Sequence, residues 1–184
     1  EHEAFGTATW QTVGGVIDLT SSRTETYAHP GALPVVADAD LASDLARRDF
    51  TINAMALHLH PDQRGELMDM HAGEQDLDQR ILRVLHAQSF HDDPTRGWRG
   101  ARYASRYGLK WEPDTSTYLK DAIASGAFDQ VTLQRQGAEW QKVLGETDVV
   151  AVLTQVSEFG LLACVHPEFG VDTTRFSRIQ GILT

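Results

Sequence analysis

Four arginines recur within one short segment at spacings of three, three and four: Arg96, Arg99, Arg102 and Arg106. On a helix, residues three and four apart share a face, so these side chains would form one positive stripe. Adjacent like charges destabilise a helix by about 0.2–0.5 kcal/mol per pair, and something must offset that repulsion. Two explanations fit: a solvated face with acids nearby, or an anionic ligand such as a polyphosphate or an RNA backbone.

A carboxylate precedes this stripe, because Asp93 lies three residues before Arg96. Cytosine and adenine each present an amino donor beside a ring-nitrogen acceptor, whereas guanine and uracil present a carbonyl acceptor beside an N–H donor. A carboxylate next to a guanidinium therefore matches C and A, and each buried polar group left unpaired by G or U costs about 1–3 kcal/mol. The structural alternative is that Asp93 only caps a helix and Arg96 pairs with Asp92.

The pattern around these residues predicts a helix that holds them. Asp92-Asp93-Pro94 is a typical start, since Asp favours the N-cap and Pro the first helical position, and Gly108 is a typical left-handed end. Upstream, the apolar spacing from Leu77 to Leu85 also predicts a helix. Three further helices are predicted at residues 115–125, 132–144 and 148–159.

The first third of the chain favours strands and turns instead. Two β-rich runs flank Gly14-Gly15 and predict a tight hairpin, because both glycines can adopt positive φ. The remaining segments are a loop at 28–34, a helix at 40–49, and a strand pair at 55–59 and 66–70. The sequence thus predicts an α+β chain in which a β-containing unit gives way to an all-helical unit near residue 78.

Composition sets the broad class. The chain has 184 residues, 41% hydrophobic and 23% charged, which is ordinary for one or two globular domains and excludes a collagen-like or wholly disordered chain. No apolar run reaches the roughly 20 residues of a membrane helix, so we expect no membrane partner. The single cysteine, Cys164, can form neither an internal disulfide nor a Cys-rich zinc site. A cytoplasmic setting is therefore the expectation.

The net charge of −10 argues against a protein that grips nucleic acid over its whole surface. Seven of the sixteen Lys and Arg residues nevertheless lie between Arg80 and Lys110. This segment alone has the charge to hold phosphates.

Residues 47–56, RRDFTINAMA, resemble the RRDxxINA motif of the class II tRNA nucleotidyltransferase and poly(A) polymerase family. Three more resemblances follow in family order: residues 67–77 (LMDMHAGEQDL), residues 89–103 with the EDxxR motif, and Arg135 with Glu139. Together they cover roughly residues 4–145. The resemblance implies the C-terminal part of a nucleotidyltransferase head at 1–78, a helical nucleotide-recognition neck at 79–145, and the start of a helical body at 146–184.

The family builds all or part of the CCA end of tRNA from CTP and ATP without a nucleic-acid template. The resemblance therefore implies CTP, ATP and the tRNA 3′ end as partners. It implies that Asp93 and Arg96 read the base, and that Arg99, Arg102 and Arg106 contact the triphosphate or the RNA. Whether the product is A, CC, CCA or a poly(A) tail stays open.

For the RRDxxINA segment, the resemblance implies that Arg47 or Arg48 binds phosphate, while Asp49 and Asn53 hold the ribose and the local loop. The structural alternative is that Asp49 caps a helix or pairs with Arg48, and that Asn53 satisfies a turn.

Nucleotidyl transfer also implies Mg²⁺, which the family binds through an Asp-x-Asp pair upstream of the RRDxxINA motif. Asp38-Ala39-Asp40 has that spacing but lies between a loop and a helix, so we do not assign it the metal. Asp18 is a candidate third acidic group or an ordinary strand residue. We therefore expect no main metal ligands in this chain and no activity from it alone. The alternative to an enzyme is a non-catalytic nucleotide- or RNA-binding module.

The sequence departs from the family pattern at several positions near these motifs. Asp92 replaces the usual Glu, Met70 the usual Pro, and Ala72 the usual first Gly. Gly97-Trp98 replaces aliphatic residues, and a glycine inside a helix costs about 1 kcal/mol relative to alanine.

Overall fold

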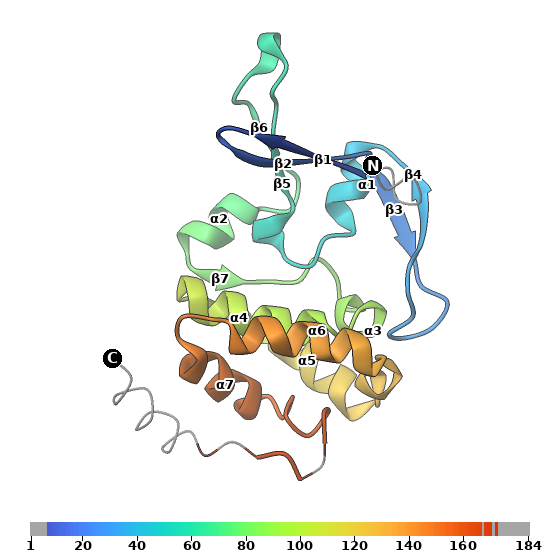
Figure 1. Ribbon diagram of the computed structural model, residues 1–184, viewed down its shortest axis with the longest axis vertical. Helices are drawn as coiled ribbons and strands as arrows, with labels where there is room; N and C mark the ends of the chain where they lie inside the picture. The colour runs from blue at the N-terminus through green and yellow to red at the C-terminus, as the bar shows by residue number, and fades with distance from the viewer. Residues whose placement is uncertain (1–6, 167, 171, 173–184) are drawn as a thin grey trace.

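The computed structural model describes residues 7–166, 168–170 and 172. Figure 1 shows β ribbons and short helices above a layer of longer helices, with the chain passing from the first part to the second at β7. The predicted α+β class and the order of its two parts are confirmed.

Two antiparallel ribbons open the chain. Strands β1 (Thr7–Thr12) and β2 (Gly15–Thr20) form the predicted hairpin, with Trp10 opposite Ile17. Strand β2 starts at Gly15, whose φ is +137°, a backbone angle that favours glycine. Strands β3 (Arg23–Thr26) and β4 (Val35–Asp38) form the second ribbon, on either side of the predicted loop.

Helix α1 (Leu41–Ala46) is shorter than predicted and ends just before the RRDxxINA segment. Asp40 caps it by accepting from the Ser43 N–H at 2.8 Å, so the side chain of this residue serves a helix start. The segment then forms a 3₁₀ turn, η2 (Thr51–Asn53). Strands β5 (Met55–Leu57) and β6 (Leu67–Asp69) pair as predicted and carry between them the short turn η3 (Pro61–Gln63).

The predicted helix from Leu77 to Leu85 is wrong. Helix α2 (Gly73–Asp78) ends one residue after Leu77, and Arg80 turns the chain with a φ of +56°. Residues Ile81–Leu82 form β7, parallel to β8 (Lys110–Trp111), and Val84 bridges to Phe50. Leu82 and Val84 are buried at a spacing of two, so the apolar residues here follow a strand period and not a helical one.

The helical layer contains five α-helices in the described part of the chain: α3 (Ser89–Asp92), α4 (Arg96–Tyr107), α5 (Pro113–Ala124), α6 (Leu133–Leu144) and α7 (Val149–Glu158). A 3₁₀ turn, η4 (Ala127–Gln130), joins α5 to α6. Gly108 ends α4 at a φ of +62°, as predicted. Helix α4 starts later than predicted, because Thr95 and not an Asp stands at its N-cap.

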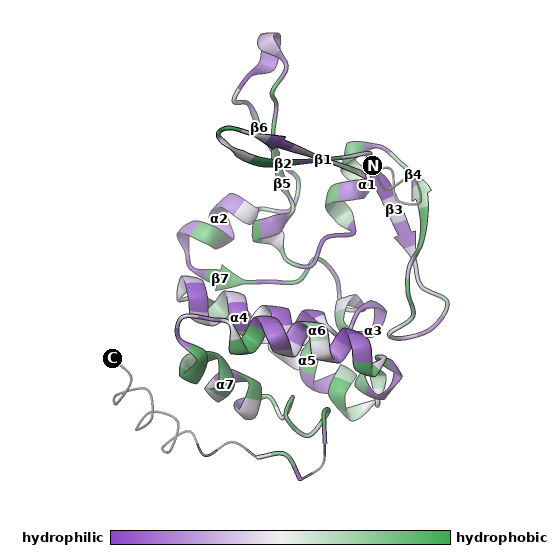
Figure 2. Ribbon diagram, viewed as in Figure 1, coloured by the Kyte–Doolittle hydropathy of each residue, from purple (hydrophilic) through white to green (hydrophobic). Residues whose placement is uncertain are grey.

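The hydrophobic core lies in the helical layer. Its members include Phe90 of α3, Trp98 of α4, Leu119 of α5, Phe128 of η4 and Leu153 of α7. Figure 2 shows α7 as mostly hydrophobic, whereas α4 carries a hydrophilic side. Phe50, which precedes β7, is fully buried in this cluster, and Ile52 packs against it, so these residues anchor the RRDxxINA segment to the helices.

The unusual Gly97-Trp98 pair is explained by this core. A Cβ on Gly97 would lie 2.9 Å from the Phe128 ring, closer than packed carbons allow. Trp98 is fully buried and meets Phe128 edge to face at 5.2 Å between ring centres. The glycine therefore makes room for the larger aromatic pair, which offsets its helix cost.

The predicted domain boundaries fall at the end of α2 and at Gly145, the residue after α6. These boundaries stay a prediction, and residues 173–184 of the predicted body segment lie outside the described residues. No helix in the described ranges is both long and apolar enough to span a bilayer.

Candidate functional site

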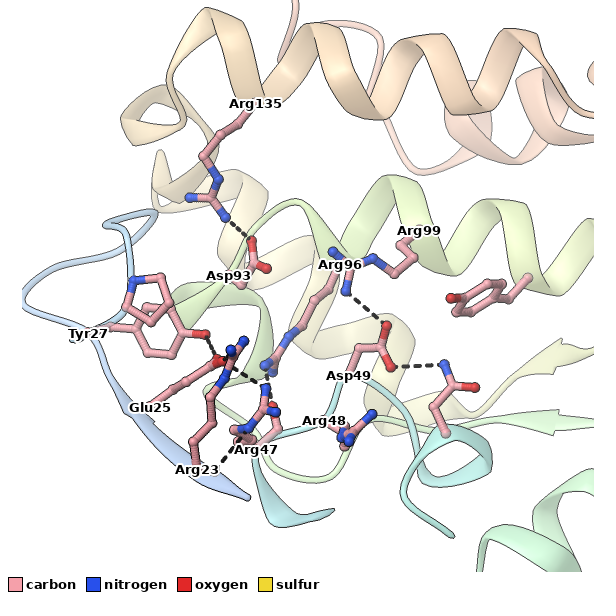
Figure 3. Close-up of a pocket in the computed structure, with 13 residues that line it drawn as sticks. Arg23, Glu25, Tyr27, Arg47, Arg48, Asp49, Asp93, Arg96, Arg99 and Arg135 are labelled. Atoms are coloured by element: carbon pink, nitrogen blue, oxygen red, sulfur yellow. Dashed lines mark hydrogen bonds and ion pairs between the residues drawn. The ribbon is translucent and has the colours of Figure 1, made fainter. Parts of the chain in front are cut away.

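A polar pocket of about 530 Å³ lies where the β ribbons meet the helical layer (Figure 3). Six arginines and three carboxylates line it, which leaves a formal surplus of three positive charges. The lining residues are Arg23, Glu25, Tyr27, Pro34, Arg47, Arg48, Asp49, Asn53, Asp93, Arg96, Arg99, Tyr103 and Arg135. A pocket of this charge suits a polyanion.

Seven of the predicted site residues meet in this pocket, and they come from two separate parts of the sequence. Residues 47–53 follow α1 and include the η2 turn, while residues 93–99 form the turn between α3 and α4 and the first turn of α4. The members are Arg47, Arg48, Asp49, Asn53, Asp93, Arg96 and Arg99.

Asp49 links these two parts. Its Oδ1 accepts from Asn53 Nδ2 at 2.9 Å and from the Phe50 N–H at 3.0 Å, and its Oδ2 accepts from Arg99 Nη1 at 3.0 Å. The alternative in which Asp49 pairs with Arg48 is wrong, because Arg48 donates to Asp44 at 2.6 Å.

Asp93 is held through one of its two oxygens. Oδ1 accepts from Thr95 N at 3.1 Å and from Thr95 Oγ1 at 2.6 Å. It also accepts from Arg135 Nη2 at 2.8 Å (Figure 3). Arg135 also donates to the Gly31 carbonyl at 2.7 Å, so it ties the β3–β4 loop to the pocket. The alternative in which Asp93 caps the helix is wrong, because Thr95 is the N-cap of α4 and the Asp93 side chain accepts from Thr95 itself, before the helix begins.

Arg96 is almost fully buried at 4% exposure. Its Nη1 donates to Ser89 Oγ at 2.6 Å, and its Nη2 donates to the Arg47 carbonyl at 2.8 Å. The alternative in which Arg96 pairs with Asp92 is wrong, because Asp92 lies instead 3.9 Å from His86 Nε2.

Strand β3 supplies a wall of the pocket that the sequence analysis missed. Glu25 accepts from Arg47 Nη1 at 2.7 Å, from Arg23 at 3.2 Å and from the Tyr27 hydroxyl at 2.8 Å. Burial, followed by the Glu25 carboxylate, raises the pKa of Tyr27 well above its ordinary value. The sequence contains a signal for this wall, because Arg23 and Glu25 are polar at a spacing of two and so share one face of a strand, and Tyr27 follows at the same spacing just after the strand ends.

The arginine stripe divides in two. Arg96 and Arg99 face the pocket, whereas Arg102 and Arg106 bind Glu146 in the α6–α7 connection, with Nε–Oε distances of 2.8 and 2.9 Å. Burial would raise the pKa of Glu146, but hydrogen bonds from Arg106 and Arg102 outweigh it and lower the pKa. Carboxylates from other elements therefore offset most of the repulsion in the stripe, and the pocket does not include Arg102 and Arg106.

Asp18 also lies outside the pocket. It is exposed on β2 and accepts from Thr9 Oγ1 at 2.7 Å across the hairpin. This contact matches the prediction that Asp18 is an ordinary strand residue, which was the alternative to a third acidic group.

The residues present do not fit a magnesium site. Within the described residues, no group of three or more His, Cys, Asp or Glu side chains is placed to hold a metal ion. The three carboxylates of the pocket, Glu25, Asp49 and Asp93, each accept from an arginine. No chemical step through a metal can be derived from these side chains.

Residues 1–83 match the Poly A polymerase head domain. The chain is also 41% identical over 160 residues to the A-adding tRNA nucleotidyltransferase of Halalkalibacterium halodurans, covering 85% of this chain and 38% of that protein. The chain belongs to the tRNA nucleotidyltransferase and poly(A) polymerase family. The family predicted from the RRDFTINAMA motif is therefore confirmed.

Solved structures of this nucleotidyltransferase family share the fold. A structure of a CCA-adding enzyme in an apo form matches with a TM-score of 0.86 at 35% identity, covering 91% of this chain and 40% of that one. A tRNA nucleotidyltransferase complexed with a primer tRNA and an incoming ATP analog matches with a TM-score of 0.81 at 30% identity, covering 92% of this chain and 47% of that one. The chain thus spans less than half the length of these relatives.

Proposed function

We propose that this protein selects the incoming nucleotide for an RNA nucleotidyltransferase that adds C, A or both to the 3′ end of tRNA from CTP and ATP. The observation that carries the proposal is that Asp93 and Arg96 line the same pocket as residues of the Arg47–Asn53 segment. In this proposal the head segment is 1–78, the neck is 79–145 and the body starts at 146.

Base selection follows from the atoms that remain free. In the described part of the chain, the hydrogen bonds of Asp93 use Oδ1, which leaves Oδ2 to accept from the amino group of cytosine or adenine. Arg96 keeps N–H groups beyond its contacts with Ser89 and Arg47, and these can donate to a ring acceptor. Guanine and uracil would place an acceptor against Asp93 and a donor against Arg96, which is unfavourable on both sides.

Phosphate and sugar binding use the rest of the pocket. Arg48 is 39% exposed while it pairs with Asp44, so its guanidinium has donors left for a triphosphate. Arg47 is more fully engaged by Asp44 and Glu25, and we assign it to holding the pocket wall. Asn53 and Asp49 lie side by side and would hold the ribose.

The tRNA partner is supported by a relative of known structure, which was complexed with a primer tRNA and an incoming ATP analog. Transfer to a primer hydroxyl is expected to use Mg²⁺, and the described residues do not supply its site. The proposal for this chain is therefore nucleotide selection. The second candidate, a non-catalytic nucleotide- or RNA-binding module, would select the same bases without extending a primer.

Titration calorimetry of the protein with the four nucleoside triphosphates tests the proposal. We expect CTP or ATP to bind at least tenfold more tightly than GTP and UTP, and Arg96→Ala to remove that preference. Lys120→Ala, an exposed residue on α5, is the control and should change nothing. Equal affinity for all four nucleotides would contradict the proposal. Incorporation of labelled nucleotide into a tRNA primer separates the enzyme from the non-catalytic module.

A further inference from the structure

We propose that Ser89 sets the orientation of the Arg96 guanidinium and thereby contributes to the choice of base. The proposal rests on the nucleotide-selecting function of the pocket. Ser89 is fully buried at the start of α3 and does not line the pocket, so it would act through Arg96 and not on the nucleotide.

The contact between the two side chains is short and buried. Ser89 Oγ accepts from Arg96 Nη1 at 2.6 Å, and the Ser89 carbonyl lies 3.4 Å from the same nitrogen. A hydrogen bond to a charged donor is stronger than one between neutral groups, and it is stronger still away from water. Ser89 thus offers Nη1 of Arg96 two acceptors, its hydroxyl and its carbonyl oxygen.

A second anchor approaches from the other part of the chain. The Arg47 carbonyl accepts from Arg96 Nη2 at 2.8 Å. A guanidinium is planar and has five N–H donors in a fixed fork, so acceptors on both terminal nitrogens fix its plane. Nε–H and one N–H of Nη2 donate to no acceptor among the described residues, and they are the donors left for a base.

Removing the Ser89 hydroxyl would leave Nη1 without its short acceptor in a buried position. Two carboxylates, Glu25 and Asp93, line the same pocket and would compete for the released guanidinium. If the Arg96 guanidinium turned toward Asp93, it would donate to the Asp93 carboxylate. The carboxylate would then no longer be placed to accept from a base, nor the guanidinium to donate to one. The expected defect is therefore in selectivity more than in overall binding.

Titration calorimetry of Ser89→Ala with CTP, ATP, GTP and UTP is the test. We expect the preference for CTP or ATP over UTP and GTP to fall about tenfold, the loss of one hydrogen bond to a charged group. Affinity for inorganic tripolyphosphate should stay within about twofold, because the phosphate-binding arginines are untouched. Ser105→Ala is the matched control, since the Ser105 hydroxyl is a buried group on α4 without a hydrogen-bond partner among the described residues and lies outside the pocket.

A purely structural role would lower the melting temperature of Ser89→Ala and leave the base preference unchanged, which would overturn the proposal. Ser89→Cys, which keeps the volume but offers a weak acceptor, should show the same loss of preference even if the alanine variant does not fold. Equal binding of all four nucleotides by the unaltered protein would instead contradict the proposed function itself.

Discussion

Arg99 on α4 donates to Asp49, fifty residues earlier in the chain, at 3.0 Å between Nη1 and Oδ2 (Figure 3). The Asp49 side chain is only 9% exposed and Arg99 is 28% exposed, so water screens the pair weakly. This contact fixes the RRDxxINA segment against the helix that carries Arg96. The pocket depends on this contact, because its two halves come from these two segments.

Arg99→Ala should lower the free energy of unfolding by about 2 kcal/mol, because it leaves the buried Asp49 carboxylate without its main cationic partner. Urea denaturation at pH 7 measures the change. Lys120→Ala, at an exposed helix position, should stay within about 0.5 kcal/mol of the unaltered protein. Equal midpoints for Arg99→Ala and Lys120→Ala would show that the pair does not stabilise the fold.

Glu146→Gln should destabilise the protein by about 2 kcal/mol at pH 7, because Arg102 and Arg106 lose a charged acceptor. The pKa of Glu146 is lowered in the folded state, so its contribution is present above the ordinary carboxyl pKa and is lost as pH falls through the lowered value. The difference between the two proteins should therefore shrink below about pH 4.

Urea midpoints measured between pH 7 and pH 3 check this dependence. Glu158→Gln, an exposed carboxylate at the end of α7, serves as the control and should track the unaltered protein at every pH. A difference for Glu146→Gln that persists unchanged at pH 3 would mean that its charge is not what binds the two arginines.

Ala72→Gly should stabilise the protein by about 0.5–1 kcal/mol. Ala72 has a φ of +57° at the start of α2, a conformation that costs an L-residue about 1–2 kcal/mol. The greater freedom of glycine in the unfolded chain cancels about 0.4–1 kcal/mol of that gain. Thermal unfolding measures the result, and Ala138→Gly in the middle of α6 should instead destabilise by about 1 kcal/mol.

Arg48→Ala and Arg102→Ala separate pocket residues from structural ones. Arg48 lines the pocket, so its loss should weaken CTP binding about tenfold. Arg102 binds Glu146 and Glu139 outside the pocket, so its loss should lower stability and change the CTP Kd less than twofold. Calorimetry on both variants decides the point, and a tenfold loss of CTP affinity in Arg102→Ala would mean that Arg102 contributes to the proposed nucleotide site.

Several local elements could be predicted from the amino-acid sequence alone. Helix α4, its glycine stop at Gly108 and the shared face of Arg96 and Arg99 follow from helical spacing and capping. The β1–β2 hairpin follows in the same way from its glycine turn. These features depend on residues only a few positions apart, whose geometry a short sequence window contains.

The partner of each charged side chain depends on the folded chain. Glu146 binds Arg102 and Arg106, which lie 44 and 40 residues earlier in the chain, and Glu25 joins the pocket through a strand face. The segment after Asp78 became a strand because β8 pairs with it and the core accepts Leu82. An ion pair or a ladder hydrogen bond forms with whatever group the fold brings within about 3 Å, and a one-dimensional pattern does not contain that distance.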